Sequence, residues 1–302
     1  MPNYHRFYGY VLRTDFPLPG LAEAPADSPV DIVLERSEVP STLGPADWSS
    51  PFIEVSGGRV LVRFAASNIR FLVEGMDRIL LDAPPGVQPA EIETFLCGPA
   101  AGVILHRRGQ LPLHAACMAL DGRAVALAGP GGRGKSTLAA ALAAAGWTHV
   151  TDDVCRVILD ERGAWAVPGP NRFRLWPDAV ARLGGDAEAL PRGRPDHPKR
   201  ILSAQMSADK PIRLAAIIRL AIDTRLEAPQ LERLTGPKAV LPMSDILYRG
   251  RLGRHLGNRD GLFQGLMHLA GITKVWQLTR DGRSGDPGDL VPSVRRVMDE
   301  TP

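Results

Sequence analysis

Residues Gly129 to Ser136 read G-P-G-G-R-G-K-S and match the phosphate-binding pattern G-x-x-x-x-G-K-[ST] at every fixed position. Such a loop turns its backbone N–H groups inward around an anion, and glycine at Gly129 and Gly134 leaves room for the turn. An apolar run of strand length, Ala124 to Ala128, precedes the loop, and an Ala/Leu-rich helical stretch, Lys135 to Ala145, follows it. Strand, loop and helix in this order predict a nucleotide-binding α/β domain. The alternative is a glycine-rich turn before an ordinary core helix.

The loop also predicts which residues hold the nucleotide. Lys135 would reach the outer phosphates and the Ser136 hydroxyl would bind Mg²⁺, so ATP and Mg²⁺ are the expected ligands. Thr137 either assists Ser136 with the metal or caps the helix. The predicted nucleotide contacts are Gly129, Gly131, Gly132, Arg133, Gly134, Lys135, Ser136 and Thr137.

Composition narrows the class of protein. The 302 residues carry a net charge of only +3, so charge alone predicts no nucleic-acid partner. No apolar stretch approaches the roughly 20 residues that span a bilayer, which predicts no membrane partner. The three cysteines, Cys97, Cys117 and Cys155, have no metal-ligand spacing and are predicted to be buried thiols of a cytoplasmic protein.

The chain divides into a strand-rich N-terminal module, residues 1–100, and a P-loop domain, residues 101–302. Ser56-Gly57-Gly58 and Gly75-Met76-Asp77 each separate two short apolar runs and predict two hairpins. A helical stretch from Glu91 to about Arg108 is interrupted at Gly98-Pro99, so one helix or two is expected.

In the second part, Val154 to Leu159 and Ala164 to Val167 predict a further hairpin. The stretch from Gly184 to Arg200 is rich in glycine, proline and basic residues and is predicted to be a mobile surface loop. Its Lys199 and Arg200 are either a solvated basic patch or part of a lid that closes on the phosphates.

Two adjacent acids follow the loop's helix at the end of a short strand. Asp152 and Asp153 come 17 and 18 residues after Lys135, where the chain returns beside the phosphate loop. Two neighbouring side chains point to opposite sides of an extended strand, so one acid would serve the metal and the other the acceptor. We expect Asp153 to join Ser136 at the metal and Asp152 to take the proton of an attacking hydroxyl. A solvated Asp-Asp turn is the alternative.

Farther along, Arg172 and Arg174 flank Phe173, so both guanidinium groups can lie on one strand face. Arginine suits the charge that develops on a phosphoryl group in transfer, and both are predicted catalytic residues. A solvated strand face is the alternative.

The segment from Leu111 to Val154 resembles the bacterial HPr serine kinase/phosphorylase family, and more closely the shorter HPr kinase-related proteins. The shared features are a histidine before the loop strand, here His114, the loop itself as G-x-x-G-x-G-K-S, and the Asp-Asp pair. The likeness continues weakly through residues 168–178 and at Tyr8-Gly9-Tyr10.

This resemblance implies the α/β fold shared by HPr kinase and phosphoenolpyruvate carboxykinase, with a mixed sheet around the nucleotide. It implies phosphoryl transfer to a serine hydroxyl, a catalytic place for His114 beside the transferred group, and a homo-oligomer. Some related proteins phosphorylate lasso-peptide precursors, so a peptide or small-protein serine is the expected acceptor. The E-I-R-G motif that HPr kinase/phosphorylases carry after the Asp-Asp pair is missing, which puts the reverse reaction and HPr as substrate in doubt.

Two other functions fit the same residues. The acceptor can be a small hydroxylated metabolite, or the chain can bind ATP as a regulatory protein without transferring phosphate. A sensor has no need of a metal-binding hydroxyl and an Asp-Asp pair, so the sequence favours an enzyme.

Overall fold

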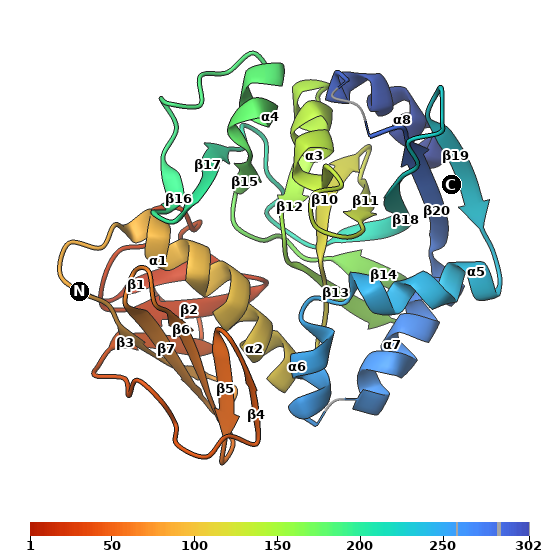
Figure 1. Cartoon of the computed structure of the whole chain (residues 1–302). Helices are drawn as coiled ribbons and strands as arrows, with labels where there is room; N and C mark the ends of the chain where they lie inside the picture. The colour runs from red at the N-terminus through yellow and green to blue at the C-terminus, as the bar shows by residue number, and fades with distance from the viewer. Residues whose placement is uncertain (258, 283–284, 302) are drawn as a thin grey trace.

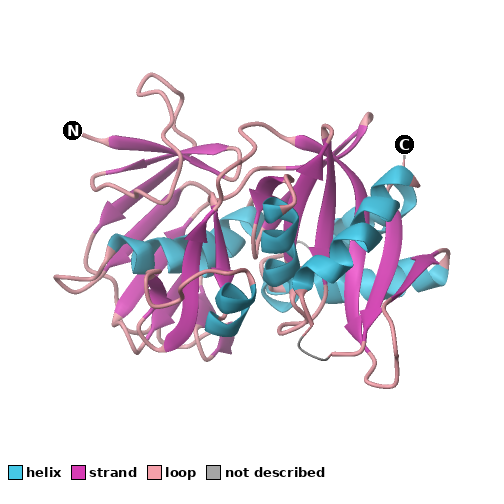
Figure 2. Ribbon diagram, turned by 90° about the horizontal axis from the view of Figure 1, so that it is seen from above, coloured by secondary structure: helices cyan, strands magenta, loops and turns pink. Residues whose placement is uncertain are grey.

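The computed structural model describes residues 1–257, 259–282 and 285–301. Their fold is mixed α/β, with three sheets and helices packed against the two larger ones (Figures 1 and 2). The first sheet lies apart from the second, and the smallest sheet bridges the region between them (Figure 1).

The first sheet uses strands from residues 3–82 only. Its strands, in chain order, are β1 (Asn3–Phe7), β2 (Tyr10–Thr14), β3 (Ile32–Arg36), β4 (Trp48–Ser50), β5 (Ile53–Ser56), β6 (Arg59–Phe64), β7 (Ile69–Glu74) and β8 (Arg78–Asp82). They lie in the order β1-β2-β3-β8-β7-β6-β5-β4, in which β3 runs parallel to both its neighbours and the other pairs are antiparallel. The two predicted hairpins are confirmed as β5–β6 and β7–β8.

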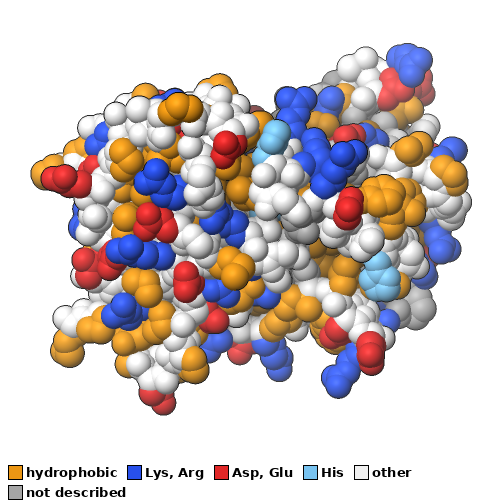
Figure 3. Space-filling view, turned by 90° about the horizontal axis from the view of Figure 1, so that it is seen from below, with side chains coloured by type: hydrophobic (Ala, Val, Ile, Leu, Met, Phe, Trp, Pro, Cys, Tyr) orange, Lys and Arg blue, Asp and Glu red, His pale blue; other side chains and the backbone are white. Residues whose placement is uncertain are grey.

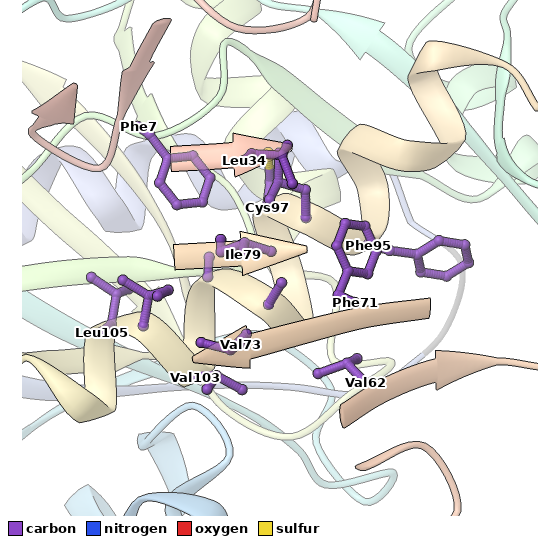
Figure 4. Packing of buried hydrophobic residues seen from close by; sticks show 14 of the residues in the cluster. Phe7, Leu34, Val62, Phe71, Val73, Ile79, Phe95, Cys97, Val103 and Leu105 are labelled. Atoms are coloured by element: carbon purple, nitrogen blue, oxygen red, sulfur yellow. The ribbon is translucent and has the colours of Figure 1, made fainter. Parts of the chain in front are cut away.

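One face of this sheet is covered by a nearly continuous helix. It consists of α1 (Pro89–Phe95), a π-helical turn (Leu96–Ala100) and α2 (Ala101–Arg107). The π-helical turn takes up Gly98 and Pro99, because proline lacks the N–H that a regular α-helix would use there. Phe95 and Leu105 pack with Phe71 and Val73 of the sheet in one buried cluster (Figure 4). The whole helix, on both sides of residue 100, therefore belongs to the core of the first sheet.

The second sheet is also mixed. Its strands are β9 (Leu111–Leu113), β10 (Ala115–Leu120), β11 (Arg123–Ala128), β12 (Thr148–Thr151), β13 (Cys155–Asp160), β14 (Gly163–Ala166), β18 (Ile212–Ile222), β19 (Gln230–Leu234) and β20 (Lys274–Arg280). The order is β12-β10-β11-β18-β14-β13-β9, with β20 between β18 and β19. β18 runs parallel to β11 and β20, while β13 and β14 form the predicted hairpin.

Helices cover both faces of this sheet. α3 (Lys135–Ala144) and α8 (Val291–Asp299) pack on one face through Leu138 and Val294. α7 (Arg259–Ile272) packs on the other through Leu262 and Leu266. The shorter helical segments are α4 (Pro177–Arg182), α5 (Pro237–Val240), the 3₁₀ turn Leu241–Ile246, α6 (Gly250–His255) and the 3₁₀ turn Pro287–Leu290.

The third sheet corrects the predicted mobile loop. β16 (Arg192–Arg194) and β17 (His197–Ser203) pair with each other, and β17 pairs with β15 (Arg172–Leu175). The prediction of a loop is wrong for the second half of Gly184 to Arg200, because the strand partner, β15, is remote in sequence. β15 contacts α3 and β16 contacts α1, so this sheet lies between the two larger ones (Figure 1).

The surface mixes charges of both signs, as Figure 3 shows for one face. The three cysteines are buried and free, as predicted. Among the residues that the structure describes, no helix has the length and apolarity needed to cross a bilayer.

Candidate active site

The predicted phosphate-binding loop connects β11 to α3. Gly129 has φ +132°, and a Cβ there would lie 2.8 Å from the Leu220 carbonyl oxygen of neighbouring β18. Gly134 has φ +88° and precedes the first turn of α3. Both backbone conformations are strained for residues with a side chain, so glycine is required at these two positions.

Lys135 is held inside this loop. Its Nζ donates hydrogen bonds to the carbonyl oxygens of Gly129 at 2.8 Å and Pro130 at 3.2 Å. The side chain is buried, and burial lowers the pKa of Lys135 while the charges of Asp153 and Asp152 oppose the change. These two hydrogen bonds leave the Lys135 ammonium group with a further N–H that it can donate to an anion.

A cavity of about 410 Å³, here called the P-loop cavity, lies over this loop. Every predicted nucleotide contact except Gly129 lines it. The rest of the lining includes polar residues, among them His114, Asp153, Arg174 and Lys199, and apolar residues, among them Leu220, Leu278 and Leu290. Its size lies within the range of pockets that bind small ligands.

Asp152 faces the start of α3. Its Oδ1 accepts a hydrogen bond from the Ser136 hydroxyl at 2.8 Å, and its Oδ2 accepts one from the Arg174 backbone N–H at 2.9 Å. Burial, together with the charge of Asp153, raises the pKa of Asp152 above its usual value, and the two hydrogen bonds oppose that rise.

Asp153 has different partners. Its backbone is left-handed, with φ +77°, so the extended backbone of β12 ends before it. His114 Nδ1 lies 3.3 Å from Oδ1, and an Arg174 guanidinium nitrogen lies 3.1 Å from Oδ2. Burial alone would raise the pKa of Asp153, but the His114 hydrogen bond and the Arg174 charge outweigh it and lower the pKa. Asp153 is therefore ionised at neutral pH.

The two predicted arginines have different surroundings. Arg174 pairs with Asp153 and lines the P-loop cavity. Arg172 forms a buried ion pair with Glu93 of α1 at 2.8 Å, and Glu93 also accepts a hydrogen bond from the Gly20 N–H. Arg172 lines neither this cavity nor the second one described below, but it shares a small cavity with Asp152, Asp153 and Arg174. A catalytic role for Arg172 stays a prediction.

Lys199 joins the site from β17. It lines the P-loop cavity, and its Nζ lies 5.7 Å from the centre of the Trp176 ring. Burial and the nearby charge of Arg174 lower the pKa of Lys199. Neighbouring Arg200 is instead buried and paired with Glu188. Sequence reasoning left Lys199 among loop cations because its strand was not predicted.

A second cavity of about 410 Å³, the aromatic cavity, meets the first. His114, Asp153 and Arg174 line both. Its other lining residues come from well-separated parts of the chain and are Phe52, Phe64, Thr94, Phe95, Pro99, Arg194, Asp245, Leu247, Tyr248 and Arg249. Apart from Arg249, which belongs to a basic stretch of the sequence, these residues could not be predicted as a site, since none belongs to a local motif.

The phosphate-binding loop, the paired acids and the histidine, on which the resemblance to HPr kinase-related proteins rests, thus lie together in one site. Residues 101–183, which hold all of these features, match the family model described as "SynChlorMet cassette protein ScmC".

Among solved structures, the chain is similar to the Hpr(Ser) kinase/phosphatase from Coxiella burnetii, with 14% sequence identity and a TM-score of 0.35. That match covers 63% of this chain and 98% of the other. At this TM-score the likeness assigns no residue role. No curated protein matches the chain.

Proposed function

We propose that the chain is an ATP- and Mg²⁺-dependent kinase that transfers a phosphoryl group to a serine hydroxyl of a peptide or small protein. The observation that carries this proposal is the shared wall of the two cavities. One cavity has a phosphate-binding loop, the other is free for an acceptor, and an ionised carboxylate, a histidine and an arginine lie where they meet.

On the donor side, the loop's N–H groups and the N-terminal end of α3 would hold the phosphates of ATP. Lys135 would exchange its bonds to Gly129 and Pro130 for bonds to phosphate oxygens. Arg174 and Lys199 would place positive charge over the transferred group from the third sheet.

For the metal, we propose Ser136 and Asp152 in place of Ser136 and Asp153. A hydroxyl and a carboxylate 2.8 Å apart supply hard oxygen ligands, and Mg²⁺ is usually held by one or two carboxylates together with substrate phosphates. When bound, Mg²⁺ would neutralise charge on the phosphates. Asp153 lines the same cavity as Ser136, but its two carboxylate oxygens are already paired with His114 and Arg174.

We accordingly propose that Asp153 is the carboxylate that contacts the acceptor hydroxyl. Its carboxylate would accept the hydrogen bond of the serine hydroxyl and then its proton, as the serine oxygen bonds to the γ-phosphorus and the bond from that phosphorus to the β-phosphate oxygen breaks. His114 would hold Asp153 in place and donate to the transferred group. A carboxylate with a lowered pKa is a weak base, so its main contribution would be to orient the hydroxyl for in-line attack.

The remaining predictions belong to the same proposal. They are a lasso-peptide precursor as one acceptor, a cytoplasmic location, a homo-oligomer, and a division into an N-terminal module and a P-loop domain. The resemblance to HPr kinase-related proteins supports the first and third, and composition supports the second. The predicted boundary between residues 100 and 101 falls inside the helix that packs on the first sheet, so we propose that the N-terminal module extends through α2.

The test is transfer from ATP labelled at the γ-phosphate to serine peptides and to fractionated cell extract. We expect label in a peptide or protein fraction, and loss of about 100-fold in ATP affinity for Lys135→Met, since it removes charge-assisted hydrogen bonds to phosphate. Lys210→Met, at an exposed position, is the matched control. Label in a small metabolite would favour the metabolite kinase, and tight ATP binding without transfer to any hydroxyl would favour the regulatory protein.

A further inference from the structure

The aromatic cavity is lined by a stacked ladder of rings. The rings of Phe64 and Phe95 are stacked with their centres 3.6 Å apart, and Phe52 stacks on Phe64 at 6.2 Å and 22°. The Arg194 guanidinium lies 5.4 Å from the centre of the Phe95 ring and closes the inner end of the ladder. Phe64 and Phe95 are buried, whereas Phe52 is 44% exposed. The ladder therefore ends in one open ring.

Three charged residues around the ladder, Arg194, Arg174 and Asp245, already have charged partners in the protein. Arg194 Nε donates to Asp196 at 2.9 Å, Arg174 pairs with Asp153, and Asp245 lies 3.8 Å from Arg219. The Arg249 guanidinium lies 5.7 Å from the centre of the Tyr248 ring. At Arg194, Arg174 and Asp245 an added ionic group would have to displace a charged partner, while a flat apolar group needs only the face of Phe52.

The backbone around the same cavity is unusual. Arg249 is left-handed, with φ +48°, and Pro99 lies in the π-helical turn. Strained non-glycine residues and π-helical turns are enriched at functional sites. Tyr248 fits against the helix because position 102 is glycine, where a Cβ would lie 2.8 Å from the Tyr248 ring. Special local geometry thus holds Pro99, Tyr248 and Arg249 in place in the lining of this cavity.

We infer that the aromatic cavity is the acceptor subsite and selects a peptide that carries an aromatic side chain close to the serine. This inference rests on the proposed function. The aromatic side chain would stack on Phe52 while the serine hydroxyl reaches Asp153, which lines the same cavity. The first sheet, which supplies Phe64 and places Phe52 before β5, would then serve acceptor choice rather than ATP binding.

The experiment compares serine peptides that differ at one position. A phenylalanine is placed at each position next to the serine in turn, with alanine and leucine at that position as controls, and kcat/KM is measured at saturating ATP. We expect the best phenylalanine peptide to exceed its alanine version by about fivefold to tenfold through KM, since aromatic pairs contribute beyond their buried area. Leucine should give only part of this gain.

The variant Phe52→Ala links the preference to this surface. It should reduce the preference for phenylalanine to near onefold, because kcat/KM falls far more for the phenylalanine peptide than for the alanine peptide, as in a double-mutant cycle. A merely structural role would lower both rates equally. Phe263→Ala, at a 65% exposed ring on α7, is the matched control and should keep the preference.

The outcomes separate the two proposals. Transfer to peptides with no aromatic preference, or a preference that survives Phe52→Ala, overturns the inference and leaves the kinase proposal standing. The binding of the same peptides to Asp153→Asn is measured by calorimetry. If binding shows the aromatic preference but the unmodified protein transfers phosphate to none of the peptides, the kinase proposal is overturned and the subsite stands. If the peptides show neither a binding preference nor transfer, both proposals are overturned.

Discussion

The P-loop cavity and the aromatic cavity are equal in volume, about 410 Å³ each, but they are built in opposite ways. Residues 131–138, one continuous segment, form a whole wall of the first. The second takes its walls from short pieces around Phe52, Phe64, Phe95, Arg194 and Tyr248. A contiguous backbone wall suits an invariant ligand such as a phosphate chain, while a wall of distant side chains suits a variable partner.

The largest expected effect comes from Asp153, one of the three residues that line both cavities. Asp153→Asn should lower kcat by about 1000-fold, because loss of an acid–base or orienting carboxylate costs roughly 10² to 10⁴ in rate. Asparagine accepts the left-handed backbone, so the fold should survive. ATP affinity should change far less, which steady-state kinetics with both substrates would measure.

The matched control is Asp121→Asn, at an exposed turn residue that is also left-handed, with φ +51°. It should leave kcat unchanged. Full activity of Asp153→Asn would show that the shared wall is not the reaction centre, and would return Asp152 to that role.

The next prediction changes the phosphate-binding loop alone and leaves the aromatic cavity untouched. Gly129→Ala should lower the free energy of unfolding by about 2 kcal/mol, because alanine is strained at φ +132° and its Cβ meets the Leu220 carbonyl. A Cβ added at Gly131 would have nothing within 4 Å, so Gly131→Ala should change the free energy of unfolding little. Urea unfolding of the two variants measures the difference, and equal values would contradict the observed loop.

A smaller effect perturbs the aromatic side alone. Alanine usually stabilises a helix by roughly 0.5–1 kcal/mol over glycine, but in Gly102→Ala the new Cβ would press on Tyr248. We expect a severalfold higher KM for peptide with KM for ATP unchanged. Gly271→Ala in α7, where nothing lies within 4 Å, should show the plain helical gain in thermal stability and normal kinetics. A rise in KM for ATP alone would contradict the assignment of the two cavities.

The smallest expected effect is the pH dependence of stability. The pKa of Asp153 is lower in the folded than in the unfolded chain, so its contribution is present above the unfolded pKa of about 3.9 and is lost as pH falls through the folded pKa. The pKa of Asp152 is raised, so its contribution is most favourable at low pH and is lost as pH rises through the folded value.

Unfolding free energies of the two asparagine variants between pH 3 and 7 measure this contrast. Relative to the unmodified protein, Asp153→Asn should be less stable at pH 7, by about 1 kcal/mol, with the gap narrowing as pH falls. Asp152→Asn should show the opposite slope. The same slope for both would mean that the two carboxylates have equivalent surroundings.

The donor side could be predicted from sequence because its determinants are local. The loop, its glycines, Lys135, the flanking strand and helix, and the β13–β14 hairpin follow from short patterns, and α3 begins at Lys135 as expected. The place of Asp152 and Asp153 beside the loop could also be expected from spacing. The partners that each acid side chain takes could not be expected, since they depend on the left-handed conformation of Asp153.

The rest depends on pairings between distant residues. The strands β16 and β17 are short, polar and stabilised by β15, so their own sequence looks like a loop. Arg172 and Arg174 stand in the same alternating pattern, yet Arg172 pairs with Glu93, 79 residues earlier, while Arg174 pairs with Asp153. The ladder of Phe52, Phe64 and Phe95 becomes visible only when the first sheet and α1 are packed together.

Arg174 belongs to both cavities and to the small third sheet, and this has a thermodynamic consequence. If a nucleotide draws its guanidinium from Asp153 toward a phosphate, the carboxylate becomes freer to bind a hydroxyl, and the acceptor binds more tightly. By linkage, the acceptor must then raise nucleotide affinity by the same factor. One arginine would make the two substrates cooperative, and ATP would be held most firmly when there is a hydroxyl to receive its phosphate.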